Sequence, residues 1–107
     1  MRISKIVRMD NSVIYTHPHM ASASEVVEAA HKAGVSFAGA NLAGLHIPNI
    51  NLEGADFTGA FLTRTYLNGA NLRNVNFTNA NMMMTSIAGA DTSGANFTGA
   101  NTRGINR

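Results

Sequence analysis

The sequence repeats every five residues from Val35 to the end of the chain, and this period limits the fold more than any other feature. A large apolar residue stands at the centre of most five-residue steps. The centres are Phe37, Leu42, Ile47, Leu52, Phe57, Leu62, Leu67, Leu72, Phe77, Met82 and Ile87, followed less regularly by Thr92, Phe97 and Thr102. A helix repeats at 3.6 residues and a strand at 2, so a period of five fits neither. It predicts short extended pieces separated by tight turns.

The other positions of each step support this interpretation. A small or β-branched residue, most often Ala, stands two positions before most centres, and Asn or Asp usually stands just before the centre. Gly or Asn dominates two positions after the centre, where it supplies the chemistry of a tight turn. The large and the small apolar residue would both point inward, since close packing needs small residues beside large ones.

A second period, of twenty residues, predicts a closed cross-section. Four of the five phenylalanines, Phe37, Phe57, Phe77 and Phe97, are spaced by twenty. If four steps make one turn, these rings form a column along the axis, at the spacing of about 4.8 Å between paired strands. The expected fold class is therefore an all-β solenoid.

Several five-residue segments resemble the pentapeptide-repeat motif, A-(D/N)-(L/F)-x-x. The clearest segments are residues 40–44, 55–59, 70–74 and 95–99. The resemblance covers about residues 35–106 and implies a right-handed quadrilateral β-helix. Residues 35–107 would form about four coils of this solenoid. The family serves many roles, so the resemblance specifies the fold far more than the function.

Residues 1–34 do not follow the repeat and are expected to form an N-terminal cap. Ile3 to Tyr15 resembles two short strands around a turn at residues 10–12, and the segment 17–19 (His-Pro-His) is expected to break the second strand. A solenoid needs a cap over its terminal coil.

A short helix over about residues 22–33 is expected to complete the cap. Ser22 and Glu25 form a capping-box pattern, and Gly34 is well placed to end the helix. The layout of strands, helix and repeats is similar to that of small phage- and prophage-type pentapeptide proteins.

Composition limits the classes of function. The chain has 107 residues, enough for one domain, with 13% charged residues and a formal net charge of +2. This charge is too small to indicate direct nucleic-acid binding. No apolar run approaches the roughly 20 residues that span a bilayer, and the N-terminus lacks the apolar region of a signal peptide. A cytoplasmic protein without membrane contact is expected.

No pattern of residues in the sequence indicates a catalytic site. The chain has no cysteine, and no serine lies on a nucleophile-elbow pattern. His17 and His19 are two residues apart and could face one metal ion, but no third ligand is identifiable and Pro18 favours a solvated loop. The sequence predicts no catalytic residue, cofactor, metal or small-molecule substrate. A metal-dependent enzyme that uses the two histidines remains a distant alternative.

Apolar and basic residues that break the repeat pattern indicate a protein partner. Phe61 and Tyr66 stand where Asn or Asp is usual, and Met83 and Met84 occupy turn positions. Folding onto a coil of twenty residues gathers them at one corner with Arg64. The expected partner-binding residues, including two flanking ones, are Phe61, Arg64, Tyr66, Met83, Met84, His46 and Arg103. Aromatic residues, Met and Arg are enriched at protein interfaces.

The resemblance also raises a specific inhibitory role. Some pentapeptide-repeat proteins associated with quinolone resistance imitate DNA and bind gyrase, and a phage-type inhibitor of a host nucleic-acid machine, such as a CRISPR complex or gyrase, is the most specific form of the partner hypothesis. Duplex DNA as long as this solenoid carries about ten negative charges. The solenoid instead has one net positive charge, from Glu53, Asp56 and Asp91 against Arg64, Arg73, Arg103 and Arg107.

A structural or self-assembling protein is the competing hypothesis. Thr92 and Thr102 replace large centres near the C-terminus. A last coil with open backbone groups could pair with another chain, which would give a homodimer.

Overall fold

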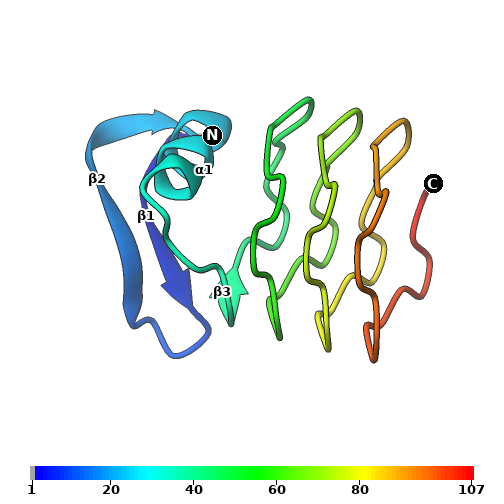
Figure 1. Cartoon of the computed structure of the whole chain (residues 1–107). Helices are drawn as coiled ribbons and strands as arrows, with labels where there is room; N and C mark the ends of the chain where they lie inside the picture. Colours follow the sequence, from blue (N-terminus) through cyan, green and yellow to red (C-terminus); the bar gives the residue numbers. More distant parts are fainter. Residues whose placement is uncertain (1) are drawn as a thin grey trace.

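The computed structural model describes residues 2–107, which form an N-terminal sheet-and-helix region followed by a ladder of stacked coils (Figure 1). The elements in chain order are β1 (Arg2–Arg8), β2 (Val13–Ser22), α1 (Ala23–Lys32) and β3 (Ala40–Asn41). After β3 the chain consists of turns and isolated β-bridges. The part of the chain that the structure describes, residues 2–107, contains no helix that could span a lipid bilayer.

A tight turn joins β1 to β2, as the sequence predicts. The two strands pair in antiparallel fashion. At the turn, the Ser12 N–H donates to Asp10 Oδ1 at 2.9 Å, and the Asn11 N–H donates to the Arg8 carbonyl at 2.9 Å. Asn11 has a φ of 70°, a left-handed conformation that Asn tolerates better than most residues. The predicted hairpin is confirmed.

The predicted break at His17-Pro18-His19 is wrong, because β2 continues through these residues to Ser22. The strand order is β2-β1-β3, so β2 lies at the edge of the sheet, where a proline without an N–H is tolerated. The pairing is also irregular here: Lys5 lies opposite Thr16, whereas Ile3 lies opposite Ala21. The excess residues of β2 bulge away from β1, so Pro18 need not donate to the ladder.

Helix α1 begins and ends close to the predicted bounds. The Ser22 hydroxyl caps it by accepting the Glu25 N–H at 3.1 Å. Gly34 follows the helix with a φ of 77°, the conformation typical of a helix C-terminus. The buried residues of α1 are Ala23, Val26, Val27 and Ala30. They belong to the same apolar cluster as the first coil residues, so helix and coils share one core.

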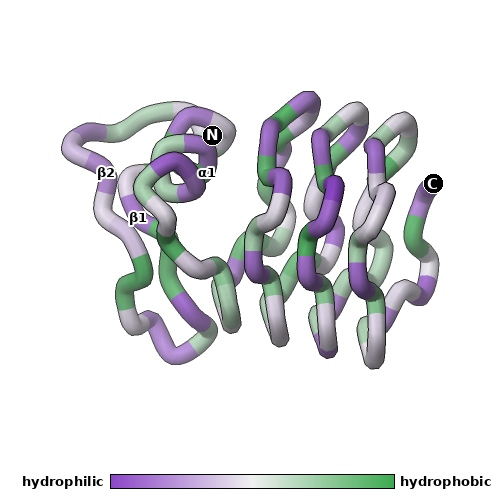
Figure 2. Tube along the Cα trace, in the orientation of Figure 1, coloured by the Kyte–Doolittle hydropathy of each residue, from purple (hydrophilic) through white to green (hydrophobic). Residues whose placement is uncertain are grey.

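Parallel pairing between residues twenty apart builds the ladder. Asp56 pairs with Asn76, and Asn76 pairs with Asn96. The Phe57 N–H donates to the Asn76 carbonyl at 2.8 Å, and the Asn76 N–H donates back to the Ala55 carbonyl at 3.0 Å. Figure 2 shows the consequence, because hydrophobic and hydrophilic positions recur in register from coil to coil. The predicted period of twenty is confirmed.

Each five-residue step ends in a turn with a left-handed residue. In one example, the Ala60 N–H donates to the Phe57 carbonyl at 3.0 Å, and Gly59 has a φ of 65°. A positive φ at the third residue matches a type II turn. Asn79 takes the same conformation one coil later, with a φ of 59°.

The predicted phenylalanine column forms the centre of the core. Neighbouring ring centroids lie 4.9 Å apart for Phe37 and Phe57, 5.7 Å for Phe57 and Phe77, and 5.1 Å for Phe77 and Phe97. All three pairs are stacked. The first three rings are buried, whereas Phe97 is half-buried. Core burial therefore decreases toward the C-terminal coil.

The N-terminal sheet continues directly into the first coil. β3 lies in that coil and pairs with β1 in antiparallel fashion, with Val7 opposite Asn41 and Arg8 opposite Ala40. Figure 1 shows the hairpin and helix together at one end of the ladder and the C-terminus at the other. One sheet thus joins residues on both sides of the predicted boundary at residues 34 and 35.

Candidate partner-binding corner and histidine cluster

The predicted partner-binding residues surround one turn of the ladder, which we call the corner surface (Phe61, Arg64, Tyr66, Met83 and Met84). Arg64 and Met84 occupy equivalent turn positions one coil apart, with φ values of 58° and 60°. Every other residue with a positive φ in residues 2–107 is Gly or Asn. A left-handed conformation costs other residues about 1–2 kcal/mol. The corner surface therefore places two long side chains where the fold favours small ones.

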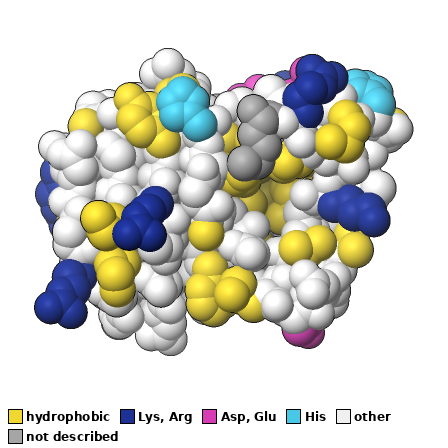
Figure 3. Space-filling model, turned by 180° about the vertical axis from the view of Figure 1, so that it is seen from behind, with side chains coloured by type: hydrophobic (Ala, Val, Ile, Leu, Met, Phe, Trp, Pro, Cys, Tyr) yellow, Lys and Arg dark blue, Asp and Glu magenta, His cyan; other side chains and the backbone are white. Residues whose placement is uncertain are grey.

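Exposure differs among the residues of the corner surface. Met84 is 50% exposed and Tyr66 is 38% exposed, whereas Phe61 and Met83 are half-buried and Arg64 is exposed. Figure 3 shows hydrophobic side chains in separate small groups on the face it displays, some of them beside basic side chains. The accessible apolar area at the corner thus comes mainly from Tyr66 and Met84.

The two flanking residues also lie at this corner. The rings of His46 and Tyr66 pack with centroids 4.4 Å apart, and the two residues are paired by a parallel bridge. The Met84 N–H donates to the Arg103 carbonyl at 2.8 Å. The structure thus brings the predicted set to one region, although Phe61 and Met83 contribute little exposed surface.

Positive charge accompanies the apolar groups at the corner. The ion pairs within residues 2–107 are His17–Glu25, Glu28–Lys32 and Arg73–Asp91. Arg64 and Arg103 take part in none of them. An apolar surface with two free guanidinium groups would complement a partner that offers apolar side chains and carboxylates.

The carboxylates of the ladder have local structural roles. The Thr58 hydroxyl and backbone N–H donate to Asp56 and lower the pKa of its carboxyl. Ser93 does the same for Asp91. In the Asp56 column, Asn76 and Asn96 accept the corresponding bonds from Thr78 and Thr98. These two carboxylates therefore hold turns of the ladder.

Two shallow hollows lie where the N-terminal region meets the first coils. One, of about 230 Å³, is lined by His31, Gly34, Val35, Ser36, Gly54, Ala55 and Asp56. The other, of about 240 Å³, is lined by Ser22, Ala23, Gly44, Leu45 and His46. The first brings His31 and Asp56 to one hollow, which their separation in sequence did not indicate. Both volumes are below the roughly 300 Å³ typical of small-molecule sites.

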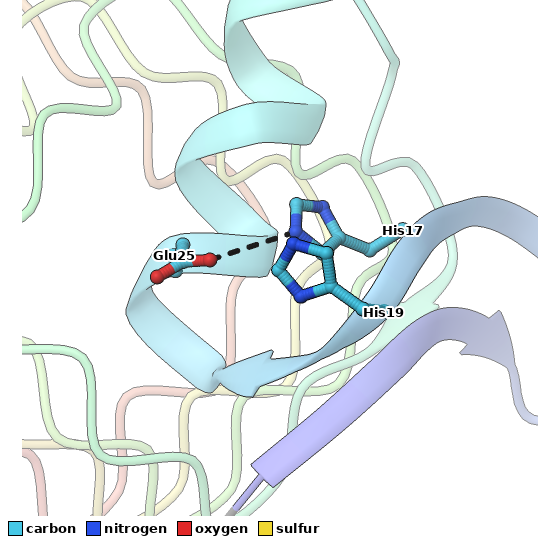
Figure 4. Close-up of side chains that lie close together, drawn as sticks. All are labelled: His17, His19 and Glu25. Carbon is cyan, nitrogen blue, oxygen red and sulfur yellow. Dashed lines mark ion pairs between the residues drawn. The ribbon is translucent and has the colours of Figure 1, made fainter.

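The structure gives His17 and His19 a third neighbour that the sequence interpretation missed. Glu25, in the first turn of α1, lies with both histidines in a group whose potential ligand atoms are all within 4.8 Å of one another (Figure 4). His17 Nε2 lies 3.6 Å from a Glu25 carboxylate oxygen. The predicted solvated loop is therefore wrong for His17, whose side chain is only 11% exposed.

Comparison with known proteins decides the family. A family model described as "Pentapeptide repeats" matches in eight copies over residues 36–74, 49–83 and 62–91, which together cover more than half of the chain. This chain belongs to the pentapeptide-repeat family. Membership implies the right-handed quadrilateral β-helix expected from the motif. Proteins of this family are in general structural or interaction proteins.

Three solved pentapeptide-repeat proteins are similar to the chain. A protein from the thylakoid lumen of Arabidopsis thaliana is 31% identical, with a TM-score of 0.51, over 61% of this chain and 49% of its own. HetL of the cyanobacterium Nostoc sp. strain PCC 7120, involved in the regulation of heterocyst differentiation, is 26% identical, with a TM-score of 0.43, over 61% and 33%. Rfr23 of Cyanothece 51142 is 26% identical, with a TM-score of 0.33, over 62% and 48%.

These similarities are partial. The chain spans about half the length of the Arabidopsis protein and a third of that of HetL. None of the curated proteins compared with the chain matches it. The pentapeptide-repeat assignment therefore establishes the fold and the broad class of the protein.

Proposed function

We propose that this pentapeptide-repeat protein is a non-catalytic protein-binding module whose contact surface is the corner surface. The observation that carries the proposal is the placement of Arg64 and Met84 in left-handed turn positions. Strained backbone positions persist where another requirement outweighs their cost. The two residues add an exposed thioether and an exposed guanidinium to the corner surface.

The shape of the chain supports a binding role. We infer that residues 1–34 cap one end of a solenoid of about four coils, whose rigid sides display side chains in fixed columns. An aromatic ring backed by a second ring, as Tyr66 is backed by His46, is held for contact at little cost in conformational entropy. The partner that fits is a protein surface with apolar groups and carboxylates, because Arg64 and Arg103 lie at this corner and take part in no ion pair within residues 2–107.

An inhibitor of a host nucleic-acid machine is the most specific form of this proposal, and it depends on family analogy alone. The charge balance of the solenoid favours contact with a protein surface over imitation of DNA. We expect no direct binding to nucleic acid, and the cytoplasmic location expected from the sequence stays a prediction.

Glycine substitutions can separate binding from folding. Replacing both Arg64 and Met84 by Gly relieves two left-handed residues, so we expect stability to be kept or raised while partner capture is lost. The matched control is Asn74→Gly together with Asn79→Gly, since both residues have a φ of 59° and lie outside the corner surface. Affinity capture from bacterial lysate with mass spectrometry, together with thermal melting, measures both effects. Equal capture by the corner and control variants would refute the proposal.

Self-association through the last coil is the second candidate. Within residues 2–107, the backbone N–H groups of Thr92, Phe97 and Thr102 have no backbone acceptor, although the equivalent groups one coil earlier do. Such open groups can pair with another chain. Light scattering over a wide concentration range tests this candidate: a dimer that persists in the Arg64→Gly/Met84→Gly variant but is lost on deleting residues 102–107 would support it.

A further inference from the structure

We propose that His17, His19 and Glu25 form a binding site for a divalent transition metal ion, with Zn²⁺ as the expected occupant. The three side chains come from two elements that pack against each other, the edge strand β2 and the first turn of α1. Two imidazoles and one carboxylate form a donor set that suits Zn²⁺ in three-ligand sites with an open fourth position. Magnesium and calcium, which prefer oxygen ligands, fit this set poorly.

The distances are within reach of such a site. The ligand atoms lie within 4.8 Å of one another, whereas tetrahedral Zn²⁺ with bonds of about 2.0–2.2 Å needs them roughly 3.3–3.5 Å apart. The His17 side chain is largely buried, while His19 and Glu25 are exposed. Small rotations of the two exposed side chains toward the fixed His17 ring would close the site.

His17 is the strongest sign of a missing ligand. Both of its ring nitrogens are buried and have no hydrogen-bond partner within the described part of the chain. Buried polar groups are normally satisfied, and each exception needs an explanation. Its Nε2 faces the Glu25 carboxylate across 3.6 Å, which is longer than a hydrogen bond. A metal ion held by both groups would satisfy the nitrogen and the carboxylate together.

One contact of His19 resembles that of a metal-bound histidine. Its Nδ1 lies 3.2 Å from the Met20 carbonyl. Since a carbonyl only accepts, Nδ1 carries the proton in this contact, and a neutral ring then presents the lone pair of Nε2. Metal-bound histidines commonly donate their other ring N–H to a backbone carbonyl in this way.

Glu25 departs from the usual arrangement of a capping box. Its backbone N–H donates to Ser22 Oγ, but within residues 2–107 its carboxylate does not bond back to the Ser22 N–H, as the motif would predict. The carboxylate is directed toward the histidines instead (Figure 4). A bound ion would link α1 to the part of β2 where pairing with β1 is irregular, and would brace that segment.

The test is a titration of the full chain, purified without a histidine tag and dialysed against a chelator. Calorimetry with Zn²⁺ is expected to show one site, and saturating Zn²⁺ should raise the midpoint of thermal unfolding by about 5 °C or more. His19→Asn and Glu25→Gln should each weaken binding about tenfold or more while leaving the melting of the metal-free protein nearly unchanged, since both side chains are exposed. The matched control is His46→Asn, which should bind normally.

Nuclear magnetic resonance gives an independent readout. Zn²⁺, but not Mg²⁺, should shift the ring resonances of His17 and His19 and leave those of His31 unchanged. Three results would overturn the proposal: no binding up to millimolar Zn²⁺, binding that survives both substitutions, or binding that is lost in His46→Asn. A simple His17–Glu25 ion pair predicts the first result.

Discussion

The coils and the N-terminal region hold their residues in different ways. In the coils, Phe57 lies between Phe37 and Phe77, in a column whose stacked rings are all phenylalanines at equivalent positions. In the N-terminal region, each contact is formed once. Ile6 of β1 is equally buried, but no residue at a fixed spacing shares its environment. The coils therefore repeat one packing arrangement, whereas the hairpin and the helix each depend on contacts that are formed only once.

The backbone pairing shows the same contrast. The bridges of the coils are all parallel and join residues twenty apart without a shift. The β1–β2 pair has two register shifts. Repetition keeps the coils in register, because a slip would misplace every column together. The hairpin can accept a bulge, and it is there that the proposed metal site lies.

The largest expected effect comes from deleting a ring inside the column. Phe77→Ala should lower the free energy of unfolding by about 3–5 kcal/mol, because Phe77 is buried between two stacked rings. Phe97→Ala should cost distinctly less, since Phe97 is half-buried and has one ring neighbour. Ile6→Ala provides the single-copy comparison and should fall between them. Urea unfolding followed by circular dichroism measures all three, and equal losses for Phe77 and Phe97 would contradict the picture of a column.

A smaller effect is expected from the turn glycines. Gly34→Ala and Gly69→Ala both place a side chain at positive φ, which costs about 1–2 kcal/mol. A Cβ at Gly34 meets nothing within 4 Å, whereas one at Gly69 would lie 2.2 Å from Asn49 Oδ1 of the preceding coil. Gly69→Ala should therefore be the more destabilising in thermal melts. Adding Asn49→Gly should remove the difference, and failure to do so would show that the neighbouring coil is not its cause.

The smallest expected effect is a pH dependence. Hydrogen bonds from the Thr58 hydroxyl and N–H lower the pKa of Asp56, and Ser12 lowers that of Asp10 in the same way. A lowered pKa in the folded state stabilises the protein above the unfolded pKa of about 3.9, and this stability is lost as the pH falls through the folded pKa. Asp56→Asn should weaken that acid loss with little change at neutral pH, because Asn76 and Asn96 already occupy the column.

Asp10→Asn is the single-copy comparison for this pH effect. Asp10 has no equivalent residue in a ladder. Its substitution therefore tests whether Asn can replace Asp56 without loss of stability because the position belongs to the repeat. Melting curves at neutral pH and at about pH 3 compare the two variants. If Asp56→Asn lost more stability at acid pH than the native chain does, the predicted effect of the lowered Asp56 pKa would have the wrong sign.

The sequence by itself determined the solenoid. The period of five places Gly or Asn at the turn position and apolar residues at two inward positions, Ala at one and Phe or Leu at the other. This pattern predicts a solenoid that buries the apolar groups, and the period of twenty predicts that four steps close one coil. The hairpin turn and the Ser22 cap were also predictable, because turns and helix starts depend on a few adjacent residues. The same two periods, of five and of twenty residues, predict that Tyr66, Met84 and Arg64 lie at one corner.

Only the tertiary structure determined the contacts between residues that do not belong to the same repeat. Pro18 remains within a strand because that strand lies at the sheet edge, a position fixed by the pairing of β1 with β3. Glu25 reaches His17 because α1 packs against β2, and neither local propensity nor spacing encodes this contact. The half-buried state of Phe61 could not be read from its position in the repeat. Turns, helix caps and repeats can be predicted from the sequence. The environment of a side chain outside the repeat depends on how the whole fold packs.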